Sequence, residues 1–319
     1  MDKLLRKLIS PVAVSGRETA VSELIEALAK PYGEVFRDPM GNLIVHRAGR
    51  GRRIMVAAHM DSIGVMVTYV DEKGFARFVS LGGMRLAAMI GQRVRFENGV
   101  YGVICAERGV EIKDLKPENL YLDTAGVPVA IGDTAAYCNE PVFMGKKVIS
   151  SYLDNRLGCA VCLRALELLK KTENDLFFVF TAQEEVGLRG ARPAAYTIQP
   201  DLAIAVDITG VPDTPGEKKV NALTLEGGPV VKLYDWSHIA RPEVVSLLEQ
   251  SGRDLGIRTQ RLVAEHGGTD AGGIIDTRGG VPTGCLAIPI RYTHNPNEIG
   301  DLEVAENCAR LLAEAVCRE

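Results

Sequence analysis

Short apolar runs recur along the chain, and each comes just before a histidine or an acidic residue. The runs are 54–58, 176–180, 202–206 and 285–290, and the residues that follow them are His59, Glu184 with Glu185, Asp207 and His294. Continuous apolar runs of this length are typical of strands buried on both faces. The sequence therefore predicts buried strands whose ends carry reactive side chains.

Helical patterns separate these runs, and one part of the chain lacks them. Apolar residues recur at helical spacing in 16–30, in 154–171 and in 302–316. Strands that alternate with helices predict an α/β domain with a mostly parallel sheet covered on both faces. Residues 67–147 instead show short β-like runs between glycine-rich turns. We expect a catalytic α/β domain made of residues 1–66 and 148–319, with residues 67–147 as a β-rich insertion.

Composition and charge narrow the class of protein. The 319 residues are 46% hydrophobic and 24% charged, with a net charge of −4, which is ordinary for a globular protein and gives no basic surface for nucleic acid. No apolar run is long enough to span a membrane, and the N-terminus has no long apolar segment. We therefore expect a cytoplasmic protein with neither nucleic acid nor membrane as a partner.

Seven cysteines are scattered along the chain, an odd number that does not indicate a disulfide framework. Cys159 and Cys162 have the spacing of a zinc pair but lie inside a helical apolar pattern. Core packing is favoured over metal or redox use for these two.

The candidate chemistry centres on two adjacent acids. On an extended backbone, Glu184 and Glu185 would point in opposite directions, so one could bind a metal while the other handles a proton. His59 and Asp61 would share a face, which gives an imidazole backed by a carboxylate. Asp154 stands just before a helical pattern, where capping is the ordinary explanation.

Taken singly, each of these residues has an ordinary structural explanation, but together they favour a site. The carboxyl ends of strands in an open α/β sheet are where such folds build their sites. A hydrolase with two metal ions needs a bridging carboxylate, further His and carboxylate ligands and a general base. The chain offers a candidate for each part, and amide hydrolysis fits this equipment.

Several separated motifs resemble those of the M42 family of metalloaminopeptidases, and the resemblance covers essentially the whole chain. The motifs lie at 58–61, 153–158, 181–187, 206–207 and 291–296, with further family elements at 268–271 and 278–284. The resemblance implies a phosphorylase/hydrolase-like α/β fold with a small barrel-like insertion that dimerises. It also implies homo-oligomers, commonly hollow tetrahedral dodecamers. Relatives of this kind include glutamyl and tetrahedral aminopeptidases, and some carry an endoglucanase-like label.

The resemblance also assigns roles to the candidate residues. One ion would be bound by His59 and Asp207, the other by Glu185 and His294, and Asp154 would bridge the two. Glu184 would be the general base, and Asp61 would orient the ring of His59. Zinc is the expected metal, and cobalt would also fit these ligands.

Two positions depart from the family pattern, and two histidines remain open. Ser62 stands where many members have Glu, and Asn155 stands where others have a second Asp. Neither departure removes an expected ligand, so we expect activity to survive. His266 is a possible substrate-side residue or a structural part of its loop, and His238 is either a channel residue or structural.

The leading functional hypothesis is an aminopeptidase that removes N-terminal residues from short peptides with a metal-bound hydroxide. A carboxypeptidase or deacylase with the same metal site is the main alternative. A glycosidase would use paired acids but would leave His59, His294 and Asp207 unexplained. A protein that assembles without turnover is the remaining alternative. The sequence does not determine which N-terminal residue is preferred.

Overall fold

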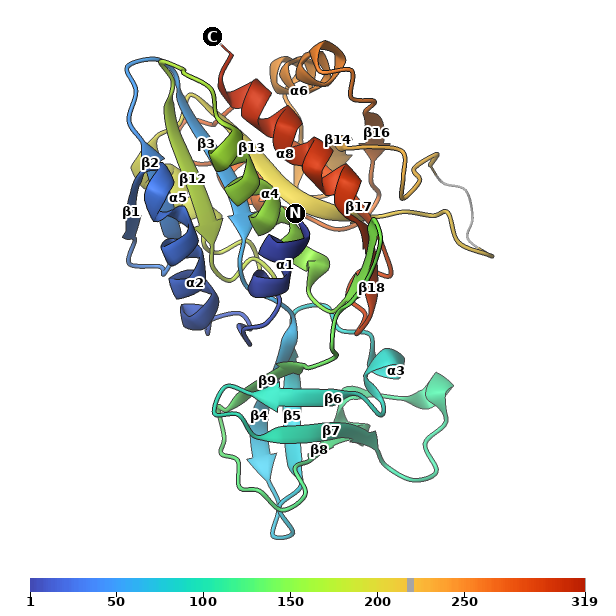
Figure 1. The fold of residues 1–319 in the computed structure, drawn as a ribbon. Helices are drawn as coiled ribbons and strands as arrows, with labels where there is room; N and C mark the ends of the chain where they lie inside the picture. The colour runs from blue at the N-terminus through green and yellow to red at the C-terminus, as the bar shows by residue number, and fades with distance from the viewer. Residues whose placement is uncertain (217–220, 319) are drawn as a thin grey trace.

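The protein consists of a large sheet packed between helices and a smaller closed barrel attached at one end (Figure 1). This computed structural model describes residues 1–216 and 221–318. Both chain termini lie in the part that contains the large sheet (Figure 1). The chain enters the barrel once and returns once, so the large part is built from two separate segments.

The large sheet contains twelve strands within the described residues, and it is mixed. The four central strands, in the order β12, β3, β13 and β17, run parallel, whereas most of the outer pairs are antiparallel. The strands are β1 (Glu34–Arg37), β2 (Leu43–Arg47), β3 (Arg53–His59), β10 (Val142–Met144), β11 (Lys147–Ser150), β12 (Asp175–Thr181), β13 (Leu202–Gly210), β14 (Val230–Asp235), β15 (His238–Ile239), β16 (Gln260–Val263), β17 (Thr283–Arg291) and β18 (Glu298–Asp301). The α/β class is confirmed, and the expected parallel pairing is concentrated at the centre, where the strands are buried on both faces.

Helices cover both faces of this sheet, and the alternation along β3 shows why. Ile54 and Val56 face a core shared with α4 and α8, whereas Met55 and Ala57 face a core shared with α5 and α7. The helices of the large part are α1 (Asp2–Leu8), α2 (Thr19–Ala29), α4 (Leu153–Leu168), α5 (Ala191–Ile198), α6 (Pro242–Asp254), α7 (Asp270–Ile275) and α8 (Leu302–Val316), with the short 3-10 helix η1 (Lys30–Tyr32). The expected helix over 302–316 is α8. Cys159 and Cys162 are free and buried in α4, as expected for core packing.

The barrel has six antiparallel strands in the closed order β4-β5-β8-β7-β6-β9. They are β4 (Gly64–Val70), β5 (Ala76–Leu81), β6 (Arg93–Phe96), β7 (Tyr101–Ala106), β8 (Leu120–Asp123) and β9 (Thr134–Tyr137), and the barrel also carries α3 (Leu86–Met89), η2 (Ile112–Asp114) and η3 (Pro117–Asn119). Alternate apolar side chains such as Val65, Val67 and Phe78 fill the interior. Strand pairing places the barrel at residues 64–137, because β10 and β11 belong to the large sheet. The insertion expected at 67–147 overlaps this unit with different ends.

The start of the last helix fixes where β18 ends. The Asp301 carboxylate accepts hydrogen bonds from the backbone N–H groups of Glu303 (2.8 Å) and Val304 (3.1 Å), which caps α8. β18 pairs with both β17 and β11, and its first residue, Glu298, pairs with Ser150 of β11. None of the helices in the described ranges combines the length and apolarity that a membrane crossing requires.

Candidate metal centre

His59 is the last residue of β3, and its side chain is 2% exposed. Its Nδ1 lies 3.1 Å from the backbone oxygen of Asp61 and 3.4 Å from the Asp61 carboxylate. Its Nε2 lies 3.1 Å from Asp154 Oδ1 and 3.7 Å from Asp207 Oδ1. The ring is therefore oriented by Asp61 on one side and presents its other nitrogen to two carboxylates.

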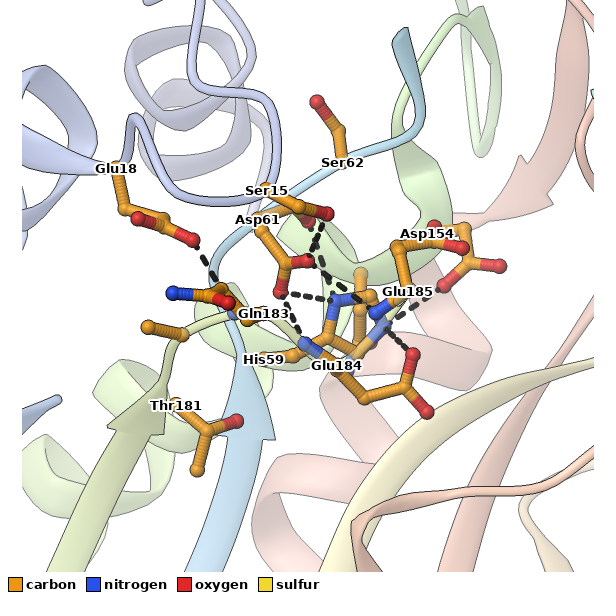
Figure 2. Close-up of polar contacts among 12 residues, drawn as sticks. Ser15, Glu18, His59, Asp61, Ser62, Asp154, Thr181, Gln183, Glu184 and Glu185 are labelled. Atoms are coloured by element: carbon orange, nitrogen blue, oxygen red, sulfur yellow. Dashed lines mark hydrogen bonds and ion pairs between the residues drawn. The ribbon is translucent and has the colours of Figure 1, made fainter. Parts of the chain in front are cut away.

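Asp61 also holds the loop that carries the two adjacent glutamates. Its fully buried carboxylate accepts hydrogen bonds from Ser15 Oγ (2.6 Å), the Glu184 N–H (3.0 Å) and the Glu185 N–H (3.2 Å). Figure 2 shows these contacts beside the ring of His59. One side chain thus positions a histidine and two glutamates, so their geometry depends on a single buried carboxylate.

Glu184 and Glu185 diverge, but for a different reason from the expected one. They lie beyond the end of β12 in a loop in which Gln183 has a φ of +56°, so the alternation of an extended strand does not apply. Glu184 Oε2 lies 3.8 Å from His59 Nε2, and Glu185 Oε2 lies 3.4 Å from His294 Nε2. The loop therefore sends the two carboxylates to different histidines.

Asp154 lies between the two histidines at the start of α4. Its Oδ1 is 3.1 Å from His59 Nε2, and its Oδ2 is 3.3 Å from His294 Nε2. Each carboxylate oxygen thus faces a different imidazole. This arrangement is the geometry that a bridging ligand between two ions requires.

His294 follows β17 in a loop, and its side chain is 30% exposed. Its backbone has a φ of +61°, which is the left-handed region that few non-glycine residues adopt. Its Nδ1 lies 2.9 Å from the backbone oxygen of Gly83, a residue of the barrel segment. Its Nε2 faces Asp154 and Glu185, so this ring is also oriented on one side and presents its other nitrogen to carboxylates.

Glu298 supports this arrangement and was not singled out by the sequence patterns. It is 1% exposed, and it accepts hydrogen bonds from the backbone N–H of His294 (2.9 Å) and from that of Asp154 (3.1 Å). Two backbone segments far apart in the sequence are therefore joined through one carboxylate. The sequence signal was limited to an acidic residue four positions after His294.

The pKa values of these groups reflect an excess of buried acids. Burial and the charge of Asp154 raise the pKa of Glu185 to about 8, and burial raises that of Glu184 well above its usual range. Burial would lower the pKa of His294, but contact with Asp154 and the charge of Glu185 raise it to about 10. Burial likewise opposes a charged His59, yet the charge of Glu184 and contacts with three aspartates raise its pKa well above the usual value.

The donor set fits divalent cations. Within the described residues, two groups of side chains bring ligand atoms within 4.8 Å of one another, and they are His59 with Glu184 and Asp207, and His59 with Asp154 and Glu185. Glu185 Oε1 is buried without a hydrogen-bond partner, which costs free energy that a bound cation would offset. Imidazole nitrogens and carboxylate oxygens are ligands that zinc accepts. Divalent ions here would offset the repulsion among the acids.

The site opens into a cavity of about 690 Å³ that is lined in part by His59, Glu184, Glu185 and His294. His266 is exposed on the wall of this cavity, as its possible substrate-side role requires. Lys232, 5% exposed, also lines it, and its Nζ lies 3.4 Å from Asp235 Oδ2.

His238 proves to be a structural residue. It is 4% exposed, and its Nδ1 lies 3.0 Å from Asp235 Oδ1. That carboxylate oxygen also accepts a hydrogen bond from the backbone N–H of His238 (3.1 Å). The ring is therefore held inside the protein by the turn between β14 and β15.

Asp270 is a further buried acid beneath the glutamate loop. It accepts a short hydrogen bond from Thr181 Oγ1 at the end of β12 (2.5 Å). Burial raises its pKa to about 7, with a further contribution from the charge of Asp207. The sequence placed Asp270 in a family motif without a role, and the structure shows that it fixes the strand end that leads to Glu184.

Comparison with known proteins identifies the family. The profile of the M42 glutamyl aminopeptidase family matches residues 41–311. The chain therefore belongs to the M42 family, and the enzyme class is that of hydrolases acting on peptide bonds.

Relatives and solved structures agree with this assignment. An Acetivibrio thermocellus protein, provisionally described as an aminopeptidase, is 46% identical over 99% of this chain and 98% of its own length. The lysyl aminopeptidase of Pyrococcus furiosus is 32% identical over 99% of this chain and 96% of its own.

An aminopeptidase structure from Desulfurococcus kamchatkensis has a TM-score of 0.94 and 34% identity, covering 99% of this chain and 94% of that one. The TET1 peptidase of Pyrococcus horikoshii has a TM-score of 0.89 and 29% identity, covering 100% and 99%. It is described as able to assemble into a tetrahedron or a large octahedral shell. The fold seen here, large sheet and barrel together, is thus shared over its whole length.

Proposed function

We propose that this protein removes N-terminal residues from short peptides with the help of two divalent ions. The observation that carries the proposal is Asp154, whose two carboxylate oxygens face two different histidines at 3.1 Å and 3.3 Å. His59 and Asp207 would hold one ion, Glu185 and His294 the other, and Asp154 both. When bound, the ions would lower the pKa of a water molecule and polarise the scissile carbonyl.

Glu184 is the proposed general base. It lies beside His59 and Asp207 and could itself hold an ion with them, but with Asp154 as the bridging ligand that set is complete without it, so its carboxylate would be free to move a proton. Burial, together with the charges of Asp207 and Asp270, raises its pKa well above the usual range, and two bound cations would shift it back towards the carboxylate that a base requires. It would accept the proton of the attacking water and pass it to the leaving amine.

The metal requirement is tested by depletion and reconstitution. Protein dialysed against a chelator should lose hydrolysis of aminoacyl chromogenic substrates, and zinc or cobalt should restore it. The panel should contain acidic, basic and apolar N-terminal residues. Buried Lys232 lines the cavity, so the charge of the N-terminal side chain is expected to matter. N-blocked peptides with a free carboxyl end test the carboxypeptidase alternative, and a β-glucan tests the glycosidase alternative. Activity that survives full metal depletion would overturn the proposal.

The role of Glu184 is tested by Glu184→Gln. The amide keeps the size of the side chain but cannot accept the proton, so kcat should fall by about 10²- to 10⁴-fold. Metal analysis of the same protein should still show two ions per chain. Glu303→Gln, an exposed change beside Lys146, is the matched control. Wild-type turnover by Glu184→Gln would remove Glu184 from the mechanism.

We further propose that the protein forms homo-oligomers, with the barrel as the dimerisation unit and dimers assembling into a dodecamer. Support comes from the TET1 relative, which shares the barrel and is described as forming closed shells. The barrel also exposes apolar side chains, among them Tyr69, Tyr101 and Ile131. Light scattering of the full chain measures the assembly directly, and a monomer at micromolar concentration would contradict it.

A further inference from the structure

A short segment of the barrel reaches into the metal centre. Residues 82–85 connect β5 to α3, and α3 is drawn at the end of the barrel that faces the large sheet (Figure 1). Gly83 and Arg85 line the same cavity as His59 and Glu184. The barrel therefore contributes part of the wall around the catalytic groups.

The backbone oxygen of Gly83 is the contact that orients His294. It lies 2.9 Å from Nδ1 and accepts the N–H of the ring, which assigns the proton to Nδ1 and leaves Nε2 free for a ligand bond. The ring of His59 is oriented in the same way by Asp61, which belongs to the same part of the protein, the large sheet and its helices. The ring of His294 is instead oriented by Gly83, a residue 211 positions away in the sequence.

The close approach requires glycine at two successive positions. A Cβ on Gly83 would lie 2.9 Å from His294 Nδ1, and a Cβ on Gly82 would lie 3.0 Å from Glu185 Oε2 and 2.7 Å from Ile63 Cγ2. Distances below about 3 Å force something to move. A side chain at Gly83 would thus displace the ring of His294, and one at Gly82 would displace Ile63 and press on Glu185.

A second contact connects the loop that carries His294 to the chain segment that follows the barrel. Asn139, two residues after β9, donates a hydrogen bond from Nδ2 to the backbone oxygen of Pro296 (3.1 Å). Pro296 lies two residues after His294 and also accepts from Ser151 Oγ (2.5 Å). The loop that carries His294 is thus held by the β5–α3 connection of the barrel and by the chain segment that follows the barrel.

We propose that the 82–85 segment is a positioning element of the metal centre. Occupancy of the second ion site, formed by Glu185 and His294, then depends on the position of the barrel relative to the large sheet. The barrel then has a task in the active centre in addition to any task in assembly. This inference rests on the proposed function, because it takes His294 as a ligand. Gly83 acts only through His294 and is therefore a positioning residue.

The test compares Gly83→Ala with Gly279→Ala in the full-length protein. Gly83 has an ordinary φ, so the added methyl group acts through its contact with His294 alone, whereas a Cβ on Gly279 would meet nothing within 4 Å. Zinc titration against a chromogenic chelator should show two ions for the wild type and for Gly279→Ala. In Gly83→Ala one ion should bind at least about tenfold more weakly while the affinity for the other is unchanged.

A second variant guards against a folding defect. Asn139→Ala adds no clash, and it should weaken the same ion by about fivefold, the effect of one ordinary hydrogen bond. Size and thermal unfolding are measured for each variant. If wild type fails to bind two ions, the proposed function is overturned. If wild type binds two ions and both Gly83→Ala and Asn139→Ala bind them equally well, this inference alone is overturned.

Discussion

The two histidines of the metal centre are positioned in contrasting ways. His59 ends a central strand, is 2% exposed and is oriented by the carboxylate and backbone of Asp61. His294 lies in a loop, is 30% exposed and is oriented by a backbone oxygen from the barrel. A carboxylate partner makes a ligand histidine more basic, whereas a carbonyl supplies orientation without charge. We therefore expect the ion beside His59 to be bound more tightly than the ion beside His294.

The site has two halves, the His59 half with the ion beside His59 and the His294 half with the ion beside His294. Asp154→Ala should have the largest effect, because it removes the one ligand that both halves share. The two ions should bind weakly, and kcat/KM should fall by about 10³-fold. Several kcal/mol of charge stabilisation in the transition state are lost, and each loss of about 1.4 kcal/mol lowers the rate tenfold. Metal analysis and hydrolysis of a chromogenic substrate measure this. The control is Asp276→Ala, an exposed acid paired with Arg192. Loss of only one ion in Asp154→Ala would show that Asp154 does not bridge.

Asp61→Asn should weaken the ion beside His59 most and the ion beside His294 less, because Asp61 contacts the His59 ring directly but reaches the other ion site only through the backbone N–H of Glu185. An amide must turn its N–H₂ towards at least one of the three groups that now donate hydrogen bonds to the carboxylate. The amide also carries no charge beside His59. The tighter ion should bind about 10- to 100-fold more weakly. Ser15→Ala, which removes one hydrogen bond to the same carboxylate, is the control and should have a smaller effect. Equal weakening of both ions would argue against separate halves.

Glu298→Gln should act mainly on the His294 half. Its two oxygens accept from the backbone N–H groups of His294 and Asp154, so an amide N–H₂ leaves one buried N–H unsatisfied. The free energy of unfolding should fall by about 1–3 kcal/mol, and the weaker ion should be lost first. Denaturant unfolding with and without zinc measures both effects. Unchanged stability in Glu298→Gln would mean that the two backbone segments are held by other contacts.

Ser62→Ala should have the smallest effect, although Ser62 directly follows the residue that orients His59. The Ser62 hydroxyl donates to the backbone oxygen of Ala13 (3.1 Å), which also accepts from Arg156 Nη2 (3.2 Å). Its loss should cost about 0.5–1.5 kcal/mol of unfolding free energy and leave zinc affinity unchanged. A tenfold drop in kcat/KM would instead place this hydroxyl in the active centre.

The sequence anticipated one half of the site better than the other. His59, Asp207 and Asp154 stand at the ends of apolar runs or at the start of a helical pattern, and the structure brings all three together, although Asp207 lies inside β13 and not at its end. For Glu184 and Glu185 the location was right, but the extended backbone assumed for them was wrong because the chain turns after Thr181. The carboxylates facing His294, Asp154 and Glu185, were implied by the family resemblance, but its contact with Gly83 was not anticipated, because no local pattern marks a backbone oxygen as an acceptor.

The fold shows the same division. Apolar periodicity predicted the α/β class, the barrel region and the final helix, because each depends on burying one face of a local element. Periodicity did not predict the antiparallel outer strands or the ends of the barrel at residues 64 and 137, because pairing depends on strands distant in sequence.

The sequence by itself thus determined the fold class, the family and the residue types gathered for metal chemistry, since these follow from local patterns and ordered motifs. Only the tertiary structure decided how far each histidine lies from its carboxylates and that Glu298 holds the backbone N–H groups of His294 and Asp154. It also decided that Gly83 of the barrel contacts His294. The contacts of Gly83 with His294 and of Glu298 with Asp154 join segments more than one hundred residues apart, and each has a backbone atom as one partner, which leaves no pattern in the chain.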